Sequence, residues 1–417
     1  MGTSRIVENG SLRVAVFAER FPGTGGGIST AHDGLGRMLE TRHSVEYFAF
    51  EPSGDAGTET IHRTAGSRLI GGLFAGLLSL KVRRHARSGR ISAVRRIGQA
   101  IPCVRSLSGP LRRFQPHVVI MPDDQVPLLS LRIPDRAKVV WVAHHNYQRF
   151  REQPYLEPEC SYDLFLAHRL ERRAAARCHF AVFPSSYMES VFRRTLRADV
   201  PGKVIRNVLP PFSSLPEKVQ LRKELGLPDH GPGVCLPSAG TTVKGERFVP
   251  ELIRRIRSAV PDAFFVITGP VYAWLAPELP HLCMNHRVFA PGALAREQSL
   301  RWTAACDICI SPALLENYSC ALLECQGLGL PVVTFDVGGN GEIVEDGASG
   351  LVVPFPDVDS LVNAGVRLLS DAPLRHRMGV SAKVRFSMLT DSDVILAEWD
   401  AVFRRLTACG TDSGETG

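Results

Sequence analysis

The sequence lacks the features that mark secreted and metal-binding proteins. No N-terminal basic-then-apolar segment is present, so we expect the protein to work in a reducing cytoplasm. Its ten cysteines are scattered, and the C-x2-C of Cys306 and Cys309 has no second Cys or His pair at zinc spacing. The surrounding run, Ala305 to Ile310, is typical of a strand. We therefore expect no metal ion and no cofactor.

Lysine is scarce. Only seven residues are lysine among the 49 lysines and arginines, which stand against 42 acidic residues and give a formal charge of +7. An arginine bias of this kind often reflects a GC-rich genome and carries little information about function. We expect no nucleic-acid partner.

Long apolar runs are also missing. The longest uncharged stretch in the first half, Leu69 to Leu80, has twelve residues, whereas a membrane-spanning helix needs about 20. Basic residues follow from Lys81 to His85. We expect a helix packed on a sheet, with a solvated basic loop after it. The alternative is peripheral contact with the inner surface of a membrane through residues 69–87.

Length and pattern predict an α/β protein of two domains. A chain of 417 residues, 44% hydrophobic and 22% charged, is globular in composition and too long for one core. Short β-branched or aromatic runs alternate with amphipathic segments such as Leu164 to Arg177, which is the pattern of a parallel sheet with helical crossovers. The runs are Arg13 to Ala18, His117 to Met121, Val139 to Ala143, Phe180 to Pro184, Phe264 to Ile267, Ile308 to Ile310, Pro331 to Phe335 and Gly350 to Val353.

A proline-rich stretch, residues 207–216, interrupts the alternation and is predicted to be a linker. It separates a Rossmann-like domain at 1–206 from a second one at 217–390. Residues 391–417 are expected to form a closing helix, Leu396 to Leu406, and a polar tail. Two such domains facing each other would form a cleft at the carboxyl ends of their sheets, where ligands bind in doubly wound folds.

The strongest functional signal is the segment from Glu316 to Glu324. Ser319 is a suitable N-cap, so we expect a helix from Cys320 to the Gly-Leu-Gly stop that begins at Gly327. Glu324 could accept two vicinal ribose hydroxyls, and Glu316 could hold the hydroxyls of a donor sugar. Backbone N–H groups at a helix start can bind phosphate, and here they belong to Ser319, Cys320, Ala321 and Leu322.

These two glutamates, followed by Gly-x-Gly-x-Pro-Val-Val and the glycine-rich segment Gly338 to Gly347, resemble the retaining family-4 glycosyltransferases of GT-B fold. The similarity is dense from about Phe264 to Ser370. It implies an enzyme that moves a sugar from a nucleoside-diphosphate-sugar donor to an acceptor hydroxyl, with retention of anomeric configuration and without a metal. The first domain would bind the acceptor, and the second would bind the donor. Glu324 would hold the ribose, and Glu316 would hold the transferred sugar.

Lys244-Gly245 resembles the pyrophosphate-binding lysine of that family. A positive charge there would stabilise the departing diphosphate. The family usually has Gly-Arg five or six residues earlier, and here Ser238 and Ala239 occupy those places. The partner arginine is therefore missing or comes from elsewhere, with Arg247 as a candidate.

Two segments of the first half are candidates for the acceptor side. The glycine turn Gly25, Gly26 and Gly27 is not a full dinucleotide fingerprint, but its N–H groups could face a phosphate or the acceptor. A plain tight turn is the alternative. The run that begins at Trp141 ends in His144, His145 and Asn146. It resembles the family's strand whose histidine lies near the transferred sugar. His145 aligns with that histidine, and His144 fits nearly as well. The alternative is a pair of structural histidines.

The resemblance leaves the substrates open. The expected setting is bacterial glycoconjugate, polysaccharide or antibiotic biosynthesis, with a small hydroxylated molecule, a saccharide or a lipid-linked acceptor. A nucleotide-sugar epimerase of the same architecture is one alternative function. A catalytically silent sugar-nucleotide-binding protein is another.

Overall fold

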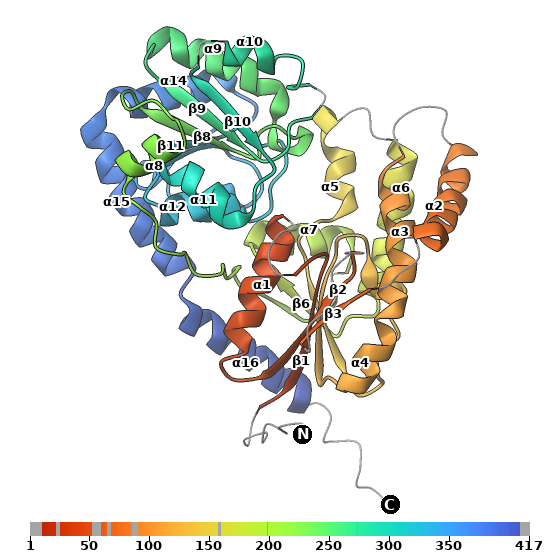
Figure 1. The fold of residues 1–417 in the computed structure, drawn as a ribbon. Coiled ribbons are helices and arrows are strands. Elements are labelled where there is room, and N and C mark those ends of the chain that lie inside the picture. The colour runs from red at the N-terminus through yellow and green to blue at the C-terminus, as the bar shows by residue number, and fades with distance from the viewer. Residues whose placement is uncertain are drawn as a thin grey trace, which may run out of the picture. The chain divides into compact units, whose positions relative to one another are not determined.

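A computed structural model describes residues 11–21, 26–51, 60–64, 68–85, 91–156, 160–197, 199–272, 274–284 and 286–408. Its contacts divide the chain into two compact units (Figure 1). Unit 1 is Met1–Pro210 with Ser392–Gly417, and unit 2 is Pro211–Asp391. The division after Pro210 falls within the stretch predicted as a linker. Each unit contains a parallel sheet with helices, which confirms the predicted α/β class.

Unit 1 holds a seven-stranded parallel sheet with the order β3-β2-β1-β4-β5-β6-β7. The chain leaves β1 and β4 in opposite directions, so their carboxyl ends form the topological switch point where ligands bind in such sheets. The strands are β1 Arg13–Ala18, β2 Ser44–Ala49, β3 Ile61–Arg63, β4 Val118–Pro122, β5 Lys138–Val142, β6 Phe180–Phe183 and β7 Gly202–Val204.

Helices cover both faces of this sheet, and each face has its own buried apolar cluster. The helices are α1 Gly27–Leu39, α2 Arg68–Arg83, α3 Ala93–Ser106, α4 Ser108–Phe114, α5 Tyr147–Glu152, α6 Ser161–Ala175, α7 Ser186–Thr195 and α16 Ser392–Ala408, with short 3-10 turns at Pro127–Leu129 and Pro154–Leu156.

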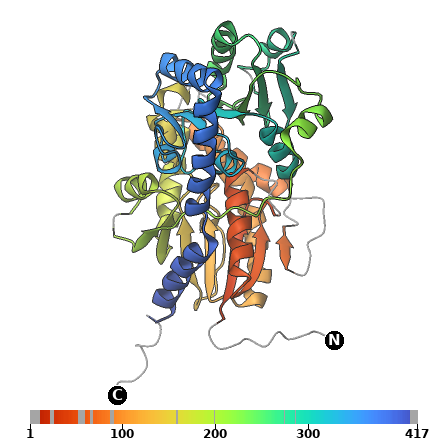
Figure 2. The same ribbon diagram turned by 90° about the vertical axis from the view of Figure 1, so that its left-hand side faces the viewer.

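The last helix of the chain packs on unit 1. Trp399 and Phe403 of α16 lie in the same buried cluster as Leu35 and Leu39 of α1, and α16 lies beside α1 (Figure 2). Asp400 adds polar contacts, because it accepts a hydrogen bond from Arg42 at 2.6 Å and lies 3.0 Å from the ring of His43.

Unit 2 holds a six-stranded parallel sheet with the order β10-β9-β8-β11-β12-β13. Its switch point lies between β8 and β11. The strands are β8 Gly233–Pro237, β9 Phe264–Thr268, β10 Val288–Gly292, β11 Ile308–Ser311, β12 Val332–Phe335 and β13 Gly350–Val353.

The helices of unit 2 complete the doubly wound domain around one apolar cluster. They are α8 Lys218–Glu224, α9 Val249–Ala259, α10 Leu279–Cys283, α11 Arg296–Ala304, α12 Cys320–Gly327, α13 Asn340–Ile343, α14 Val358–Ser370 and α15 Ala372–Leu389, with 3-10 turns η3 Thr242–Lys244 and η4 Glu246–Phe248. The predicted helix start at Cys320 is confirmed.

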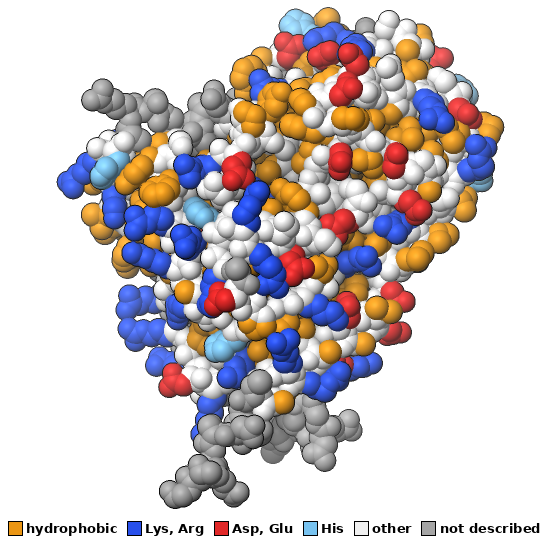
Figure 3. All heavy atoms as spheres, turned by 180° about the vertical axis from the view of Figure 1, so that it is seen from behind, with side chains coloured by type: hydrophobic (Ala, Val, Ile, Leu, Met, Phe, Trp, Pro, Cys, Tyr) orange, Lys and Arg blue, Asp and Glu red, His pale blue; other side chains and the backbone are white. Residues whose placement is uncertain are grey.

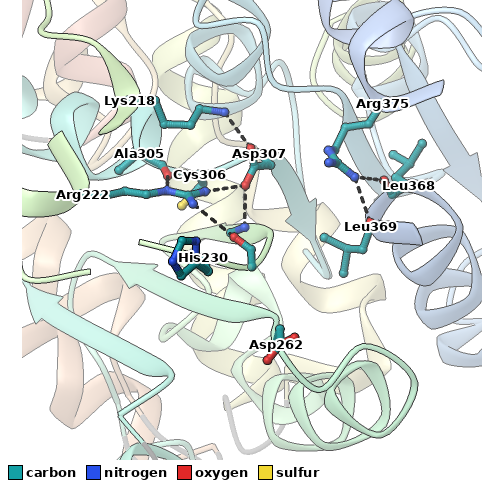
Figure 4. Close-up of polar contacts among 12 residues, drawn as sticks. Lys218, Arg222, His230, Asp262, Ala305, Cys306, Asp307, Leu368, Leu369 and Arg375 are labelled. Atoms are coloured by element: carbon teal, nitrogen blue, oxygen red, sulfur yellow. Dashed lines mark hydrogen bonds and ion pairs between the residues drawn. The ribbon is translucent and has the colours of Figure 1, made fainter. Parts of the chain in front are cut away.

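A partly buried ion pair network ties α8 to the sheet (Figure 4). Asp307, just before β11, accepts hydrogen bonds from Lys218 at 2.7 Å and from Arg222 and the Gly233 N–H at 2.6 Å each. Burial acts to raise the pKa of Asp307, but these donors together hold it below its usual range. Cys306 and Cys309 are buried free thiols. The strand predicted over Ala305 to Ile310 is confirmed for Ile308 to Ile310 only, because β11 begins at Ile308 and Cys306 precedes it.

The apolar segment from Leu69 to Leu80 is a helix, as predicted, but its expected packing is wrong. Helix α2 packs mainly on α3 rather than on the sheet, and six of its large apolar side chains are exposed. The reason is that α2 approaches α3 through small residues, which leaves its leucines outside. Within the described ranges, no helix has both the length and the apolar character that crossing a membrane requires.

Candidate functional site

Lys244 and Glu316 meet at the switch point of unit 2. Lys244 ends the η3 turn that follows β8, and Glu316 lies in the loop that follows β11. Their side chains form an ion pair in which Lys244 donates to the Glu316 carboxylate. The loop and the turn are also joined through the backbone, because the Leu314 N–H donates to the Val243 carbonyl at 3.0 Å. The topology therefore brings together two charged residues that lie 72 positions apart.

Two glycines fix this arrangement. Gly245 has a φ of +84°, and a Cβ there would lie 1.9 Å from the Pro312 carbonyl oxygen. Gly338 has a φ of +62°, and a Cβ there would lie 2.0 Å from the carbonyl oxygen of Glu316. Both positions require glycine, for the left-handed backbone and for the close approach. The Lys-Gly and Gly-Gly patterns thus hold the backbone on either side of the Glu316 loop.

The second glutamate has a different partner. Glu324 lies on α12, and its carboxylate accepts a hydrogen bond from Arg296 Nε at 2.7 Å. Burial raises the pKa of Glu324, although the charge of Arg296 opposes this shift. Arg296 begins α11, and its guanidinium also lies over the ring of Phe212, 5.5 Å from the centroid. Arg296 could not be predicted from the sequence, because only the fold brings the start of α11 beside α12.

The start of α12 has no side-chain cap from its N-cap residue. Ser319 occupies the N-cap position, as predicted, but makes no side-chain hydrogen bond to the first turn. The first N–H groups of a helix have no acceptor within the helix. The Ser319 side chain accepts none of those at the start of α12. Cys320 is buried, and burial raises the pKa of its thiol to about 12. Its thiol is therefore uncharged beside these N–H groups at neutral pH.

The positions where the family has Gly-Arg are structurally informative. Ser238 has a φ of +56°, so it adopts the left-handed conformation that favours glycine. Ala239 is fully buried and brings no charge. Arg247, the candidate substitute, lies on the η4 turn with its guanidinium 5.7 Å from the centroid of Trp274. The loop after β8 thus has the left-handed backbone that a glycine would favour at position 238. It has alanine instead of arginine at position 239.

The glycine turn of unit 1 is described only in part. Gly25 lies outside the described residues. Gly26 is the N-cap of α1 with a φ of +82°, and no described atom lies within 4 Å of the position that a Cβ would take. Gly27 begins the helix, whose first turn contains no acidic residue. The start of α1 is therefore accessible at Gly26 and free of negative charge.

His144 is one half of a buried histidine pair. Its Nε2 lies 3.2 Å from Nε2 of His32 on α1, so one ring must donate and the other must accept. Burial lowers the pKa of His32 to about 4 and that of His144 well below its usual value, and the His32 ring lowers the latter further. Both rings are therefore neutral at neutral pH.

His145 lies in an aromatic enclosure. Its ring stacks on Phe150 and meets Tyr147 edge-on, with both centroids 4.5 Å away. Burial lowers the pKa of His145 to about 4, and Asp124, 3.9 Å away, opposes that shift. Within the described residues, its Nδ1 is buried and has no hydrogen-bond partner. The histidine predicted to lie near the sugar is thus a neutral and largely enclosed side chain.

Asn146 has a clear structural task. It has a φ of +67° and is the N-cap of α5, where its side-chain oxygen accepts hydrogen bonds from the N–H groups of Gln148 and Arg149. Its amide nitrogen donates to Thr195 at 2.8 Å. The Asn146 side chain therefore shapes the turn after the two histidines.

Asp123 organises the same turn and was missed in the sequence. It follows β4 and accepts the backbone N–H groups of His144 at 2.9 Å and His145 at 2.8 Å. Burial raises its pKa well above the usual value, although those two hydrogen bonds oppose the shift. The sequence signal was the pair of aspartates, Asp123 and Asp124, that follows the apolar run His117 to Met121 after Pro122. Among all the described residues, no group of three His, Cys, Asp or Glu side chains is placed to hold a metal ion.

Solved structures share this architecture. The protein superposes on a sucrose-phosphate synthase from Thermosynechococcus elongatus with a TM-score of 0.76 and 16% identity, covering 95% of this chain and 100% of that one. An Anabaena protein, HepE, solved in complex with UDP and glucose, has a TM-score of 0.66 and 16% identity, with 94% and 100% covered. The fold is therefore the GT-B class, as predicted.

Sequence comparison identifies the second half more closely. Residues 217–385 match the family described as glycosyl transferases group 1. An alpha-D-kanosaminyltransferase from Streptomyces kanamyceticus is 30% identical over 169 residues, which are 40% of this chain and 43% of that protein. The chain thus spans less than half the length of curated relatives such as this one. The similarity to group 1 glycosyl transferases thus covers residues 217–385, which lie in unit 2.

Proposed function

We propose that this protein is a glycosyltransferase that moves a sugar from a nucleoside-diphosphate-sugar donor to an acceptor hydroxyl. The main support is the pair of ion pairs at the switch point of unit 2, Lys244 with Glu316 and Arg296 with Glu324. The group 1 family match over the same residues agrees with this. Retention of anomeric configuration is what the resemblance to family 4 implies, and we adopt it here.

Lys244 is proposed to stabilise the leaving group. In transfer, the bond from the anomeric carbon to the diphosphate oxygen breaks as the bond to the acceptor oxygen forms, so negative charge grows on the diphosphate. The proton of the acceptor hydroxyl passes to an oxygen of the departing diphosphate. A nearby ammonium group that is already oriented lowers the energy of that transition state. The Glu316 carboxylate holds Lys244 in place before donor binding. The diphosphate would then draw Lys244 away and leave Glu316 free to accept sugar hydroxyls.

Glu324 and the start of α12 are proposed to hold the nucleotide. A carboxylate offers two oxygens to the vicinal hydroxyls of a ribose, and Arg296 fixes its orientation from the other side. The first N–H groups of α12, left unused by the Ser319 side chain, would donate to phosphate oxygens. Arg247 stays a candidate for a second positive charge.

Unit 1 is proposed to supply the acceptor side. The neutral rings of His144 and His145 suit an uncharged hydroxyl compound, and the start of α1 at Gly26 and Gly27 would face the acceptor or a phosphate. The relatives support bacterial glycoconjugate, polysaccharide or antibiotic biosynthesis as the setting. The nine cysteines among the described residues are all free, which agrees with a reducing compartment such as the cytoplasm.

Two measurements test the class. Thermal unfolding in the presence of UDP, GDP or ADP should identify the donor base, because a ligand at 100 times its dissociation constant adds about 2.7 kcal/mol of stability. Nucleotide release from the matching sugar donors is then measured with and without candidate acceptors. Release stimulated by an acceptor supports transfer, an epimerised donor indicates an epimerase, and binding without turnover indicates a silent binding protein.

The two glutamates should separate binding from transfer. Glu324→Ala should weaken nucleotide binding about 10- to 100-fold, since hydrogen bonds to a charged group contribute about 1.5–3 kcal/mol. Glu316→Ala should chiefly slow transfer and leave the affinity for free nucleotide within about twofold of the unmutated value. Calorimetry with nucleotide and turnover with donor provide the two readouts. Unchanged turnover in both variants would refute the site assignment.

A further inference from the structure

Helix α2 of unit 1 exposes a continuous apolar face. Leu69, Leu73 and Leu77 are 83%, 68% and 66% exposed. At 3.6 residues per turn, all six exposed apolar side chains fall within about 140° of the helix circumference. Single exposed leucines are ordinary, but a contiguous patch marks an interaction surface. The face consists of Leu69, Ile70, Leu73, Phe74, Leu77 and Leu80.

The opposite face holds α2 in place without these leucines. A Cβ added at Gly98 of α3 would lie 2.6 Å from the backbone of Ala75, and one added at Gly71 would lie 3.1 Å from the Gln99 carbonyl oxygen. Val82 is fully buried on the same side. The two helices therefore meet through small residues at close range. The leucine face is left over from folding and is available for a partner.

The charge around this face has one sign. Residues 60–122 contain twelve lysines and arginines and no aspartate or glutamate. Since the whole chain carries +7, the remaining residues together carry −5. At the end of α2, Lys81, Arg83 and Arg84 are all exposed. Seen from behind, the left-hand side, where α2 and α3 lie, carries many basic and hydrophobic side chains and few acidic ones (Figure 3).

A pocket of about 410 Å³ lies between α2 and α3, directly beside the leucine face. Arg83 comes from α2 and Arg95 from α3, and none of the described residues that line the pocket is acidic. Guanidinium groups bind phosphate oxygens through paired hydrogen bonds. The lining thus suits an anionic headgroup, and it includes Gly76, Ser79, Leu80, Arg83, Arg95 and Gln99.

We propose that α2 docks unit 1 on an anionic phospholipid membrane, with its leucine face in the acyl region and Arg83 and Arg95 on lipid phosphates. A bilayer surface offers an apolar interior next to a layer of negative charge, which matches the apolar face and its basic end. A second copy of this chain would bring like charges together at the same face. The charge therefore favours lipid over self-association.

Vesicle sedimentation of the full chain tests the proposal. Vesicles of phosphatidylcholine containing about one third phosphatidylglycerol should bind the protein, with binding that weakens as salt rises, and pure phosphatidylcholine vesicles should bind at least about tenfold less. Leu73→Gln with Leu77→Gln should reduce binding to the anionic vesicles about tenfold or more. Arg83→Gln with Arg95→Gln should reduce it about 25-fold, since each basic residue contributes about fivefold.

Matched variants control for general loss of apolar surface or charge. Val384→Gln with Met388→Gln removes side chains that are 57% and 66% exposed on α15. Arg112→Gln with Arg113→Gln removes two exposed charges from α4. Both double variants should keep most of the binding. All variants should melt as the unmutated protein does and should bind nucleotide equally, which separates this proposal from the proposed transfer activity.

Two outcomes would overturn the proposal. One is an absence of binding to the anionic vesicles, or binding that the leucine and arginine variants leave unchanged. The other is concentration-dependent self-association without vesicle binding that Leu73→Gln with Leu77→Gln abolishes. That result would identify the face as a protein interface instead.

Discussion

The candidate site residues at the ends of the two sheets differ in charge, and unit 1 holds in addition the ion pair of Arg96 with Asp124 at 2.9 Å. In unit 2, Lys244 pairs with Glu316 and Arg296 pairs with Glu324, so charged side chains stand next to counter-charges. In unit 1, burial lowers the pKa of His145 to about 4, which leaves its ring neutral at neutral pH. Two doubly wound domains of similar topology thus carry chemically different ends.

The difference matches the two substrates of the proposed reaction. A diphosphate needs groups whose charge is already present and oriented, because orienting them later would cost free energy. A hydroxyl acceptor is uncharged, and neutral surroundings such as the pair of His32 and His144 favour it over a competing anion. Both sheets have a switch point at the carboxyl ends of their strands, and the residues at each switch point determine which ligand binds there.

Of the changes that test this difference between the units, removal of the Lys244 charge should have the largest effect on turnover. Lys244→Met should lower turnover of the donor about 10²–10³-fold, as loss of a group that stabilises the transition state does. Lys223→Met removes an exposed lysine of the same unit and should leave turnover unchanged. The measurement is initial-rate kinetics with saturating donor. Turnover of Lys244→Met near the unmutated rate would contradict the role of unit 2 in leaving-group stabilisation.

The buried, neutral ring of His145 in unit 1 predicts that the stability of the protein depends on pH. With a folded pKa of about 4 for His145 against about 6.5 when unfolded, the unfolded chain binds more protons at this residue as the pH falls. Stability is therefore lost below pH 6.5, by roughly 1 kcal/mol per pH unit down to about pH 4. The comparison is between the unmutated protein and His145→Asn, by urea unfolding at several pH values.

The buried carboxyl groups of Asp123 and Glu171 have raised pKa values and act in the opposite direction. They are present in both proteins, so their contribution largely cancels in the difference. A stability difference between the two proteins that stays constant from pH 7 to pH 5 would show that folding does not shift the pKa of His145.

Two helix caps of unit 2 offer the smallest and most specific test. Ser319→Ala should change the free energy of unfolding by less than about 0.3 kcal/mol, because the hydroxyl does not cap α12. Asp357→Ala should cost about 1 kcal/mol, since Asp357 caps α14 by accepting the Ser360 N–H at 2.9 Å. Denaturant unfolding of both variants measures the two costs. Equal costs would show that Ser319 does cap α12 and that its first N–H groups are not reserved for phosphate.

Much of the fold could be predicted from the sequence. All eight apolar runs contain strands, with shifts of about one residue at the ends. Strands that contain turn-forming residues or that alternate polar with apolar residues were not predicted from the sequence. Gly233–Pro237 and Val288–Gly292 contain both Gly and Pro, which read as turns. Ser44–Ala49 includes Glu46.

Site residues could be predicted from the sequence where they lie in a short sequence motif. The glutamates and Lys244 lie in short motifs, but the glycines explain why those motifs hold their shape. Arg296 and Asp123 act across the fold, through partners 28 and about 20 residues away. No spacing rule covers such pairs, because the sheet topology sets them. The aromatic enclosure of His145 depends on packing in the same way.

Helix α16 makes unit 1 discontinuous along the chain, with unit 2 inserted between Pro210 and Ser392. During synthesis, unit 2 leaves the ribosome whole, whereas the core around Leu35 and Leu39 must wait for Trp399 and Phe403 to arrive. Loss of α16 would then leave an apolar face of the first sheet uncovered while sparing every residue of the second sheet. Folding of unit 1 thus depends on a helix that is synthesised after the whole of unit 2.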